Sequence, residues 1–143
     1  MAERQSELTA LRVILLFTLL TTTLHYTHNV VEIERYPQFE GLSLTLTQVM
    51  VVLGGLVFTA GGLIGYRRYR QGRHWPARAW LLVYSLAGLA SLGHFLVGVP
   101  DVSAFWLGTI FTDVLSSLAL WAFVVWSASQ DRLRPAGLGS TQS

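Results

Sequence analysis

Four long apolar segments, separated by short polar breaks, dominate this chain of 143 residues. They cover about residues 11–31, 44–66, 79–99 and 102–127. A helix that crosses a bilayer core about 30 Å thick needs roughly 20 apolar residues, and each segment provides them. We therefore predict an all-α fold: an integral membrane four-helix bundle with an up-down-up-down arrangement.

The expected segment boundaries coincide with prolines, which interrupt helices. All four are expected between or after the segments and never inside one: Pro37, Pro76, Pro100 and Pro135. The first segment ends without an A-x-A cleavage site, so we expect a retained helix rather than a signal peptide. We expect one domain over residues 1–134 and a disordered tail over residues 135–143.

The composition departs from that of a soluble domain. Hydrophobic residues make up 52% of the chain, charged residues only 13%, and the mean hydropathy is +0.47. Soluble domains carry about a quarter charged residues. The basic pI near 9.4 comes from arginines at segment ends, so we expect a lipid bilayer as partner and no nucleic acid. Because the chain has no Cys, disulfides, thiolate metal sites and cysteine catalysis are excluded.

Arginine placement predicts the orientation in the membrane. Nine arginines are expected on one side: Arg4, Arg12, Arg67, Arg68, Arg70, Arg73, Arg78, Arg132 and Arg134. The other side has only Arg35, set among the acidic residues Glu32, Glu34, Glu40 and Asp101. Cytoplasmic loops carry the excess of basic residues. We therefore predict that both termini are cytoplasmic, in the cytoplasmic membrane of a bacterium.

Small and polar residues recur at helical spacing in every segment, which predicts that these faces meet inside the bundle. They include Thr18, Thr21 and His25 in the first segment, Gln48, Gly55, Thr59 and Gly62 in the second, Tyr84, Gly88, Ser91 and His94 in the third, and Thr109, Asp113 and Ser116 in the fourth. For the Gly61-x-x-x-Gly65 pattern we favour close packing within the chain over homodimerisation. A homo-oligomer or a larger membrane complex stays open.

Ionisable residues within the segments are the candidate functional residues, because a charge near the bilayer centre costs at least about 2.5 kcal/mol. Asp113 lies roughly 16 Å along a helix from Val102, close to the midplane. The other candidates lie in the outer halves of the first and third segments: His25, His28, Glu32 and His94. His74 belongs to the arginine-rich connection, where we expect an ordinary exposed residue.

These outer residues allow two cofactor hypotheses. His25 and His28, with Glu32 one turn further and His94 from another helix, form a ligand set suited to a transition metal. His25 and His94 alone are at matching heights for haem ligation, although a second histidine pair is absent. The sequence has no Ser-His-Asp order, no nucleotide-binding loop after a strand, and no His-rich clusters typical of membrane desaturases.

Three functional hypotheses remain open at this stage. The first is a non-enzymatic accessory or scaffold protein. The second is a bundle that binds a ligand or ion in a polar interior open to the outer face, where acidic residues attract cations. The third is a small intramembrane enzyme that acts on a lipid or sterol, with His25 or His94 as acid–base and Asp113 as charge partner.

Overall fold

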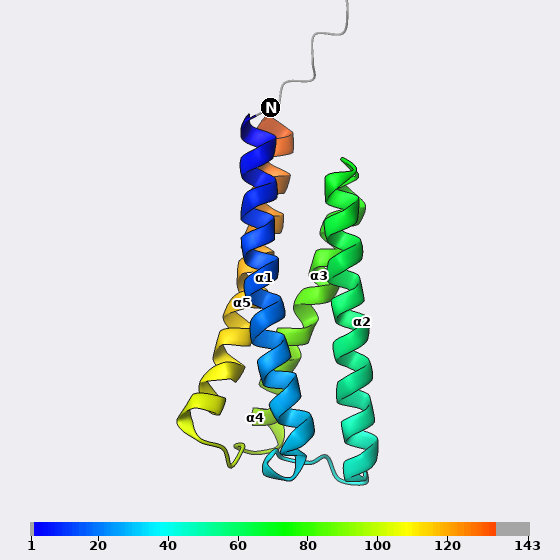
Figure 1. Ribbon diagram of the computed structural model, residues 1–143, viewed down its shortest axis with the longest axis vertical. Helices are drawn as coiled ribbons and strands as arrows, with labels where there is room; N and C mark the ends of the chain where they lie inside the picture. Colours follow the sequence, from blue (N-terminus) through cyan, green and yellow to red (C-terminus); the bar gives the residue numbers. More distant parts are fainter. Residues whose placement is uncertain (1, 134–143) are drawn as a thin grey trace, which may run out of the picture.

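The computed structural model describes residues 2–133, and this part of the chain is all-helical (Figure 1). Its elements are α1 (Ala2–Val31), η1 (Ile33–Arg35), α2 (Leu44–Arg70), α3 (His74–Ala90), η2 (Ser91–Gly93), α4 (His94–Val97) and α5 (Ala104–Leu133). Four helical runs are long and apolar enough to cross a membrane, the third combining α3, η2 and α4. This confirms the four predicted segments and suggests a membrane protein. The predicted tail, residues 135–143, lies outside the described residues.

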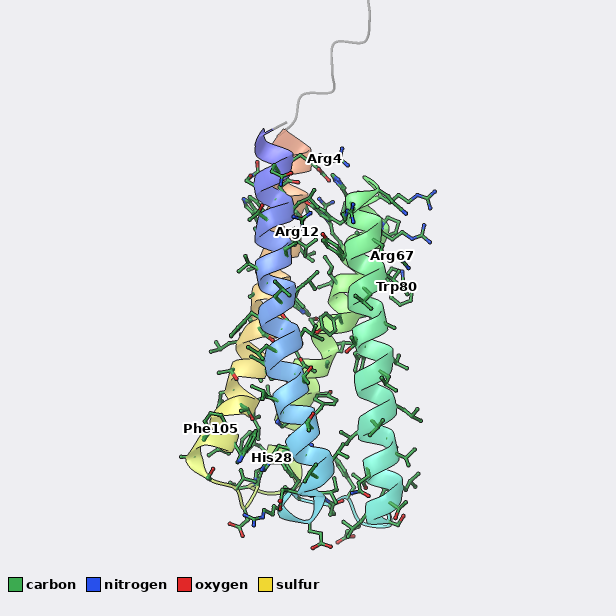
Figure 2. All side chains as sticks on the ribbon, in the orientation of Figure 1. Arg4, Arg12, His28, Arg67, Trp80 and Phe105 are labelled. Carbon is green, nitrogen blue, oxygen red and sulfur yellow. The ribbon has the colours of Figure 1, made fainter. Side chains whose placement is uncertain are left out.

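The four long helices form a ring in which α1 contacts α2 and α5, while α3 contacts α2 and α5. Contacts between these helices bring together segments that are far apart in sequence. At one end Arg4 donates a hydrogen bond to the Arg70 carbonyl, and Arg78 pairs with Asp131. We call this the arginine end. At the opposite end Asn29 contacts His94, and we call it the histidine end. Figure 2 shows Arg4 and Arg67 at the first end and His28 at the second.

The helices extend further toward the arginine end than the sequence predicted. α1 begins at Ala2, so Arg12 lies within its third turn, and α5 continues to Leu133. α3 begins at His74, which places Pro76 inside the helix rather than before it. The prediction that no proline lies inside a segment was therefore wrong. Pro76 is tolerated because the first-turn N–H groups of a helix have no intrahelical partner to lose.

The third segment is interrupted, which the sequence did not predict. After Ala90 the helix tightens into the 3₁₀ turn η2 before α4 resumes. The carbonyl of Ala87 accepts hydrogen bonds from the hydroxyls of Tyr26 and Ser91 just before this point. Side-chain donors that compete for helix carbonyls are a known cause of such irregularities. At and beyond the break, Ser91 is buried and donates a hydrogen bond to Asp113, and His94 contacts Asn29 of α1.

Glycines allow the helices to approach closely. A Cβ on Gly62 would lie within 2.6 Å of the Tyr84 ring, and one on Gly65 within 3.0 Å of Leu81. A Cβ on Gly88 would overlap the carbonyl of Asp113 and the hydroxyl of Ser117. Gly62 and Gly65 of α2 thus pack against α3 within the chain, which agrees with the close packing favoured from the GxxxG pattern. Gly88 allows α3 to approach α5 closely.

Apolar side chains cover the outside of the bundle as well as its core. The buried cluster lies toward the arginine end and consists of Leu11, Tyr69, Ala77, Leu81, Tyr84, Leu120 and Phe123. Large apolar residues point outward from all four long helices; among them are Leu16, Leu56, Leu63, Leu86, Leu115 and Val125. Such a surface fits lipid rather than water.

Two residues assigned to the arginine-rich connection are in fact part of the folded helices. Arg78 is only 1% exposed, and it donates hydrogen bonds to Ser127 and, at 2.7 Å, to Asp131. His74 stacks on Tyr69 and contacts the carboxylate of Asp131 at 3.3 Å. The expectation that His74 is an ordinary exposed residue was wrong, because the extended α3 turns both side chains toward α5.

Candidate functional site

Histidines and tyrosines from three elements meet inside the histidine end. His25 of α1 is 1% exposed, and its ring lies edge-to-face with that of His94, with the centroids 5.5 Å apart. Tyr36, which follows η1, is in ring contact with both His25 and His94. The interruption of the third segment at η2 thus brings His94 against α1.

Two hydrogen bonds orient this cluster. Asn29, one turn beyond His25, donates from Nδ2 to Nε2 of His94 at 3.0 Å. The hydroxyl of Tyr36 lies 2.8 Å from Nδ1 of His28. The ring of His28 also stacks on Trp106, with centroids 3.9 Å apart. His28 therefore faces the start of α5 and Tyr36 rather than the interior that His25 occupies.

A cavity of about 310 Å³ lies beside this cluster. Its lining includes polar side chains from α1, from the connection between α1 and α2, and from the third helical run: His25, Asn29, Gln38, Ser91 and His94. It also includes apolar side chains from the same connection and from α2, among them Phe39, Met50, Val51 and Phe58. The cavity is thus amphipathic and within the size range of small-molecule sites, about 300–1,000 Å³.

Three buried polar atoms on side chains that line the cavity have no hydrogen-bond partner among the described residues: Nδ1 of His25, Oδ1 of Asn29 and Oε1 of Gln38. The amide of Gln38 donates through Nε2 to the carbonyls of Ile33 and Tyr36. Both amides therefore use their nitrogen within the protein and leave a carbonyl oxygen that faces no donor. Buried polar groups are normally paired, so such atoms point to a missing partner.

Tyr36 contributes a neutral hydroxyl to this region. It lies in the connection between α1 and α2 and is 2% exposed. Burial raises its pKa to about 12, so the phenol stays protonated at neutral pH and can donate to His28. A backbone hydrogen bond from Asp101 to the Arg35 carbonyl, at 2.8 Å, joins the two connections that close this end.

Asp113 lies outside the cavity wall. Its carboxyl group, which is fully buried, accepts hydrogen bonds from Thr22 at 2.7 Å, Ser91 at 3.0 Å and Thr21 at 3.3 Å. Both oxygens are therefore occupied by hydroxyls from α1 and η2. This geometry is that of a link between three helices, which is how the intramembrane polar residues of a bundle commonly act.

Glu32 is separated from the histidines with which its spacing grouped it. It forms an ion pair with Arg35 at 3.0 Å, and both side chains are exposed. The helix ends at Val31, so Glu32 no longer continues the α1 stripe. Of the five candidates, the structure brings His25 and His94 together, places His28 at the edge, and leaves Glu32 and Asp113 elsewhere.

The hydrogen bonds of His28 and His94 lead to different partners, and the metal site that their spacing suggested stays a prediction. Nε2 of His94 faces Asn29 and Nδ1 of His28 faces Tyr36, so these nitrogens do not converge. Within residues 2–133 no group of three or more His, Asp and Glu side chains is arranged to hold a metal. The direct ring contact between His25 and His94 also leaves no space for a porphyrin between them.

Three residues of the site were not singled out from the sequence: Asn29, Tyr36 and Gln38. Asn29 lies four positions after His25, so helical spacing was a sufficient signal for it. Tyr36 and Gln38 belong to a connection, where periodicity carries no information. Their positions follow from the loop that folds back over the cavity.

Comparisons with family models, with curated proteins and with solved structures find no match to this chain.

Proposed function

We propose that this protein is a membrane-embedded binding protein whose cavity at the histidine end takes a small lipid-like alcohol or amine. The observation that carries this proposal is a set of three buried polar atoms that have no partner among the described residues and belong to side chains that line the cavity. Leaving a buried polar group unpaired costs about 1–3 kcal/mol, so a ligand that pairs these atoms recovers that free energy on binding.

The unpaired atoms define the chemistry of the head group. Asn29 and Gln38 present carbonyl oxygens, which only accept hydrogen bonds. A hydroxyl or an ammonium group satisfies them, whereas an ether, ester or carboxylate does not. Nδ1 of His25 pairs with a hydroxyl in either tautomer. The exposed acidic residues Glu34 and Glu40 near this end further favour a cation.

The apolar lining residues define the body of the ligand and its route of entry. Phe39 and Met50 line the cavity and are each 55% exposed at the outside of the bundle. In a membrane that surface faces lipid. A molecule that partitions into the bilayer therefore reaches the cavity sideways, with its head toward His25 and its chain along α2.

The proposed topology places the histidine end on the outer side of a bacterial cytoplasmic membrane, with an up-down-up-down chain and both termini in the cytoplasm. It is supported by the arginines gathered at the opposite end. Because the natural chain has no Cys, single cysteines at the exposed Glu40 and Gln71 report the side directly. A membrane-impermeant maleimide should label E40C in intact cells and Q71C only after lysis; the reverse pattern contradicts this orientation.

The binding proposal is tested with dodecanol and dodecylamine in lipid nanodiscs, with dodecyl methyl ether as a probe that lacks the donor. The alcohol or amine should raise the thermal stability of the protein by up to about 2.7 kcal/mol at a hundredfold excess over Kd. The ether should leave it unchanged, because it cannot donate to Asn29 or Gln38.

The variant Asn29→Leu should weaken the effect of dodecanol at least tenfold. The matched control is Gln48→Leu, since Gln48 also bonds across helices, to the Val30 carbonyl, but does not line the cavity. Equal stabilisation by alcohol and ether, or an equal loss in both variants, contradicts the proposal. Recovery of chemically altered dodecanol would favour an intramembrane enzyme instead.

A further inference from the structure

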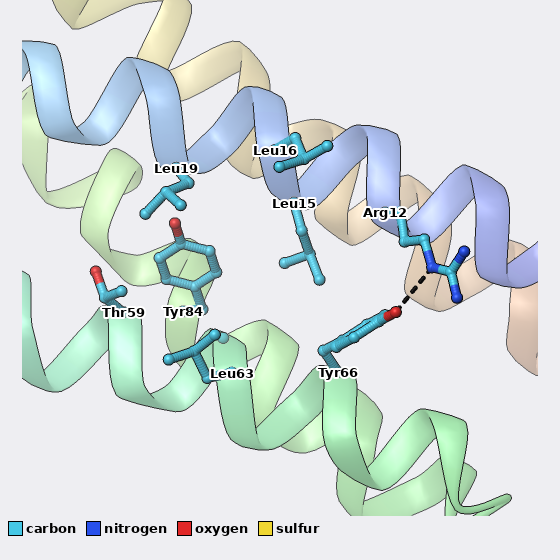
Figure 3. A pocket seen from close by; sticks show the side chains of 9 residues that line it. Arg12, Leu15, Leu16, Leu19, Thr59, Leu63, Tyr66 and Tyr84 are labelled. Atoms are coloured by element: carbon cyan, nitrogen blue, oxygen red, sulfur yellow. Dashed lines mark hydrogen bonds between the residues drawn. The ribbon is translucent and has the colours of Figure 1, made fainter.

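A second cavity lies toward the arginine end and has the shape of a groove. It has a volume of about 350 Å³, and Figure 3 shows it between α1 and α2, the neighbouring pair with the sparsest contacts in the ring. Apolar side chains of α1 and α2 line its length, among them Leu15, Leu16 and Leu63. From Thr59 to Tyr66 the groove extends about 10 Å along α2.

Arg12 lines this groove at the arginine end, and Arg70 lies beside Tyr66, which also lines it. Arg12 donates from Nε to the hydroxyl of Tyr66 at 2.7 Å, and the guanidinium of Arg70 lies 5.9 Å from the centre of the same ring. Arg12 also lines a separate polar depression, of about 490 Å³, together with Arg4 and Arg70. The apolar groove and the basic depression thus meet at Arg12.

These arginines lack an acidic partner in the part of the chain that the structure describes. The ion pairs within residues 2–133 involve Arg35, His74 and Arg78, but not Arg4, Arg12 or Arg70. The two described carboxylates at this end have other contacts, Glu7 with Tyr69 and Asp131 with Arg78. Arg4, Arg12 and Arg70 therefore line adjoining hollows, and none of them has an ion-pair partner among the residues whose side chains the structure describes.

The position of Arg12 along α1 makes its lack of an acidic partner informative. It lies eight residues beyond Arg4, about 12 Å further along α1, and apolar Leu11 and Val13 flank it. An arginine at that depth is costly unless it pairs or extends toward the interface. Its side chain reaches the hydroxyl of Tyr66 and points toward the arginine end of α1 (Figure 3).

We propose that this groove binds one anionic phospholipid of the adjacent leaflet. Its phosphate would lie between Arg4, Arg12 and Arg70, and one acyl chain would follow the groove past Leu63 toward Tyr84. Guanidinium groups suit phosphate because they offer paired, planar donors. Basic pockets between transmembrane helices at the cytoplasmic side are known sites for anionic lipid head groups. The proposal does not depend on the ligand at the histidine end.

The test is native mass spectrometry of the full chain released from nanodiscs that contain phosphatidylglycerol or phosphatidylcholine. One phosphatidylglycerol should stay bound to the wild-type protein, and its retained fraction should fall at least fivefold in the double variant R12Q/R70Q. The matched control R67Q/R73Q removes the same charge from the same end, at residues outside the groove, and should retain the lipid.

The acyl chain is tested separately, with all arginines intact. Leu63 is 61% exposed, so Leu63→Trp should fill the groove without disturbing the core and lower retention at least threefold. Leu53→Trp, at another exposed site on α2, is the control. Circular dichroism of each variant verifies that the helices are retained. Equal retention of phosphatidylcholine, equal loss in both arginine pairs, or unchanged retention in L63W overturns the proposal.

Discussion

The two ends of the bundle differ in how their buried polar side chains are paired. At the arginine end, Arg78 is 1% exposed and donates hydrogen bonds to Ser127 and Asp131, and Tyr69 donates to Glu7 beside the main apolar cluster. At the histidine end, His25 is equally buried, yet its Nδ1 has no partner among the described residues, and its side chain lines a cavity.

We associate the paired groups at the arginine end with stability, and the unpaired atoms at the histidine end with the proposed binding function. The buried side chains of Arg78 and Tyr69 at the arginine end are paired within the protein, although Nη1 of Arg78 and the hydroxyl of Tyr84 have no partner among the described residues. Their bonds join the ends of α1, α2, α3 and α5. At the histidine end three unpaired atoms belong to side chains that line one cavity, which favours a place for an external molecule over a defect in packing. The comparison yields four predictions, given below from the largest expected effect to the smallest.

The variant Arg78→Met should lower the free energy of unfolding in detergent by about 3 kcal/mol. It removes the ion pair with Asp131 and the bonds to Ser127, and breaking a buried pair leaves its partners unsatisfied. Thermal or denaturant unfolding followed by circular dichroism measures the loss. Arg67→Met, at an exposed arginine of the same end, should change stability by less than about 0.5 kcal/mol. Similar losses in both would mean that the arginine end is not held by Arg78.

The variant Gly88→Ala should cost about 1–3 kcal/mol, because its Cβ overlaps the backbone of α5 at Asp113 and the hydroxyl of Ser117. Gly93→Ala is the control, since nothing lies within 4 Å of a Cβ built there. Unfolding midpoints of the two variants in the same detergent provide the measurement. A Gly88→Ala protein as stable as Gly93→Ala would contradict the close approach of α3 and α5.

His25→Phe and His74→Phe should change stability in opposite directions, by up to about 1 kcal/mol each. Nδ1 of His25 has no hydrogen-bond partner among the described residues. Without ligand, an apolar ring of similar shape should therefore leave the free energy of unfolding unchanged or raise it. His74→Phe loses the contact with Asp131 and should destabilise. Matched unfolding curves measure both. A marked loss in His25→Phe would indicate a structural role for His25 and weaken the binding proposal.

Asp113→Asn should cost less than about 1 kcal/mol and leave dodecanol binding intact. The amide oxygen still accepts from Thr22, and interhelical hydrogen bonds in membranes contribute about 0.6 kcal/mol on average. Ligand-induced shifts in unfolding temperature, measured beside those of Asn29→Leu, separate the two residues. Loss of dodecanol binding in Asp113→Asn would instead indicate that the carboxyl group of Asp113 takes part in the binding site.

The sequence by itself determined the four helices and the residues that lie inside them. Hydropathy and helical spacing are local properties, so they were enough to predict four apolar segments and the burial of His25, Ser91 and Asp113. The same spacing pointed to Gly61 and Gly65 as close-packing positions, which face α3. Local properties failed at the segment ends, where α3 starts early enough to include His74 and Pro76.

Only the tertiary structure decided which polar group meets which partner. Arg78 was expected in a loop, but the extension of α3 places it against Ser127 and Asp131, 49 and 53 positions away in sequence. The break at η2 brings His94 to Asn29, while the end of α1 leaves Glu32 with Arg35. These pairings depend on which helix faces meet and where each helix ends. A one-dimensional pattern identifies the polar residues inside a bundle, but the unpaired atoms that indicate a ligand become visible only when all four helices are in place.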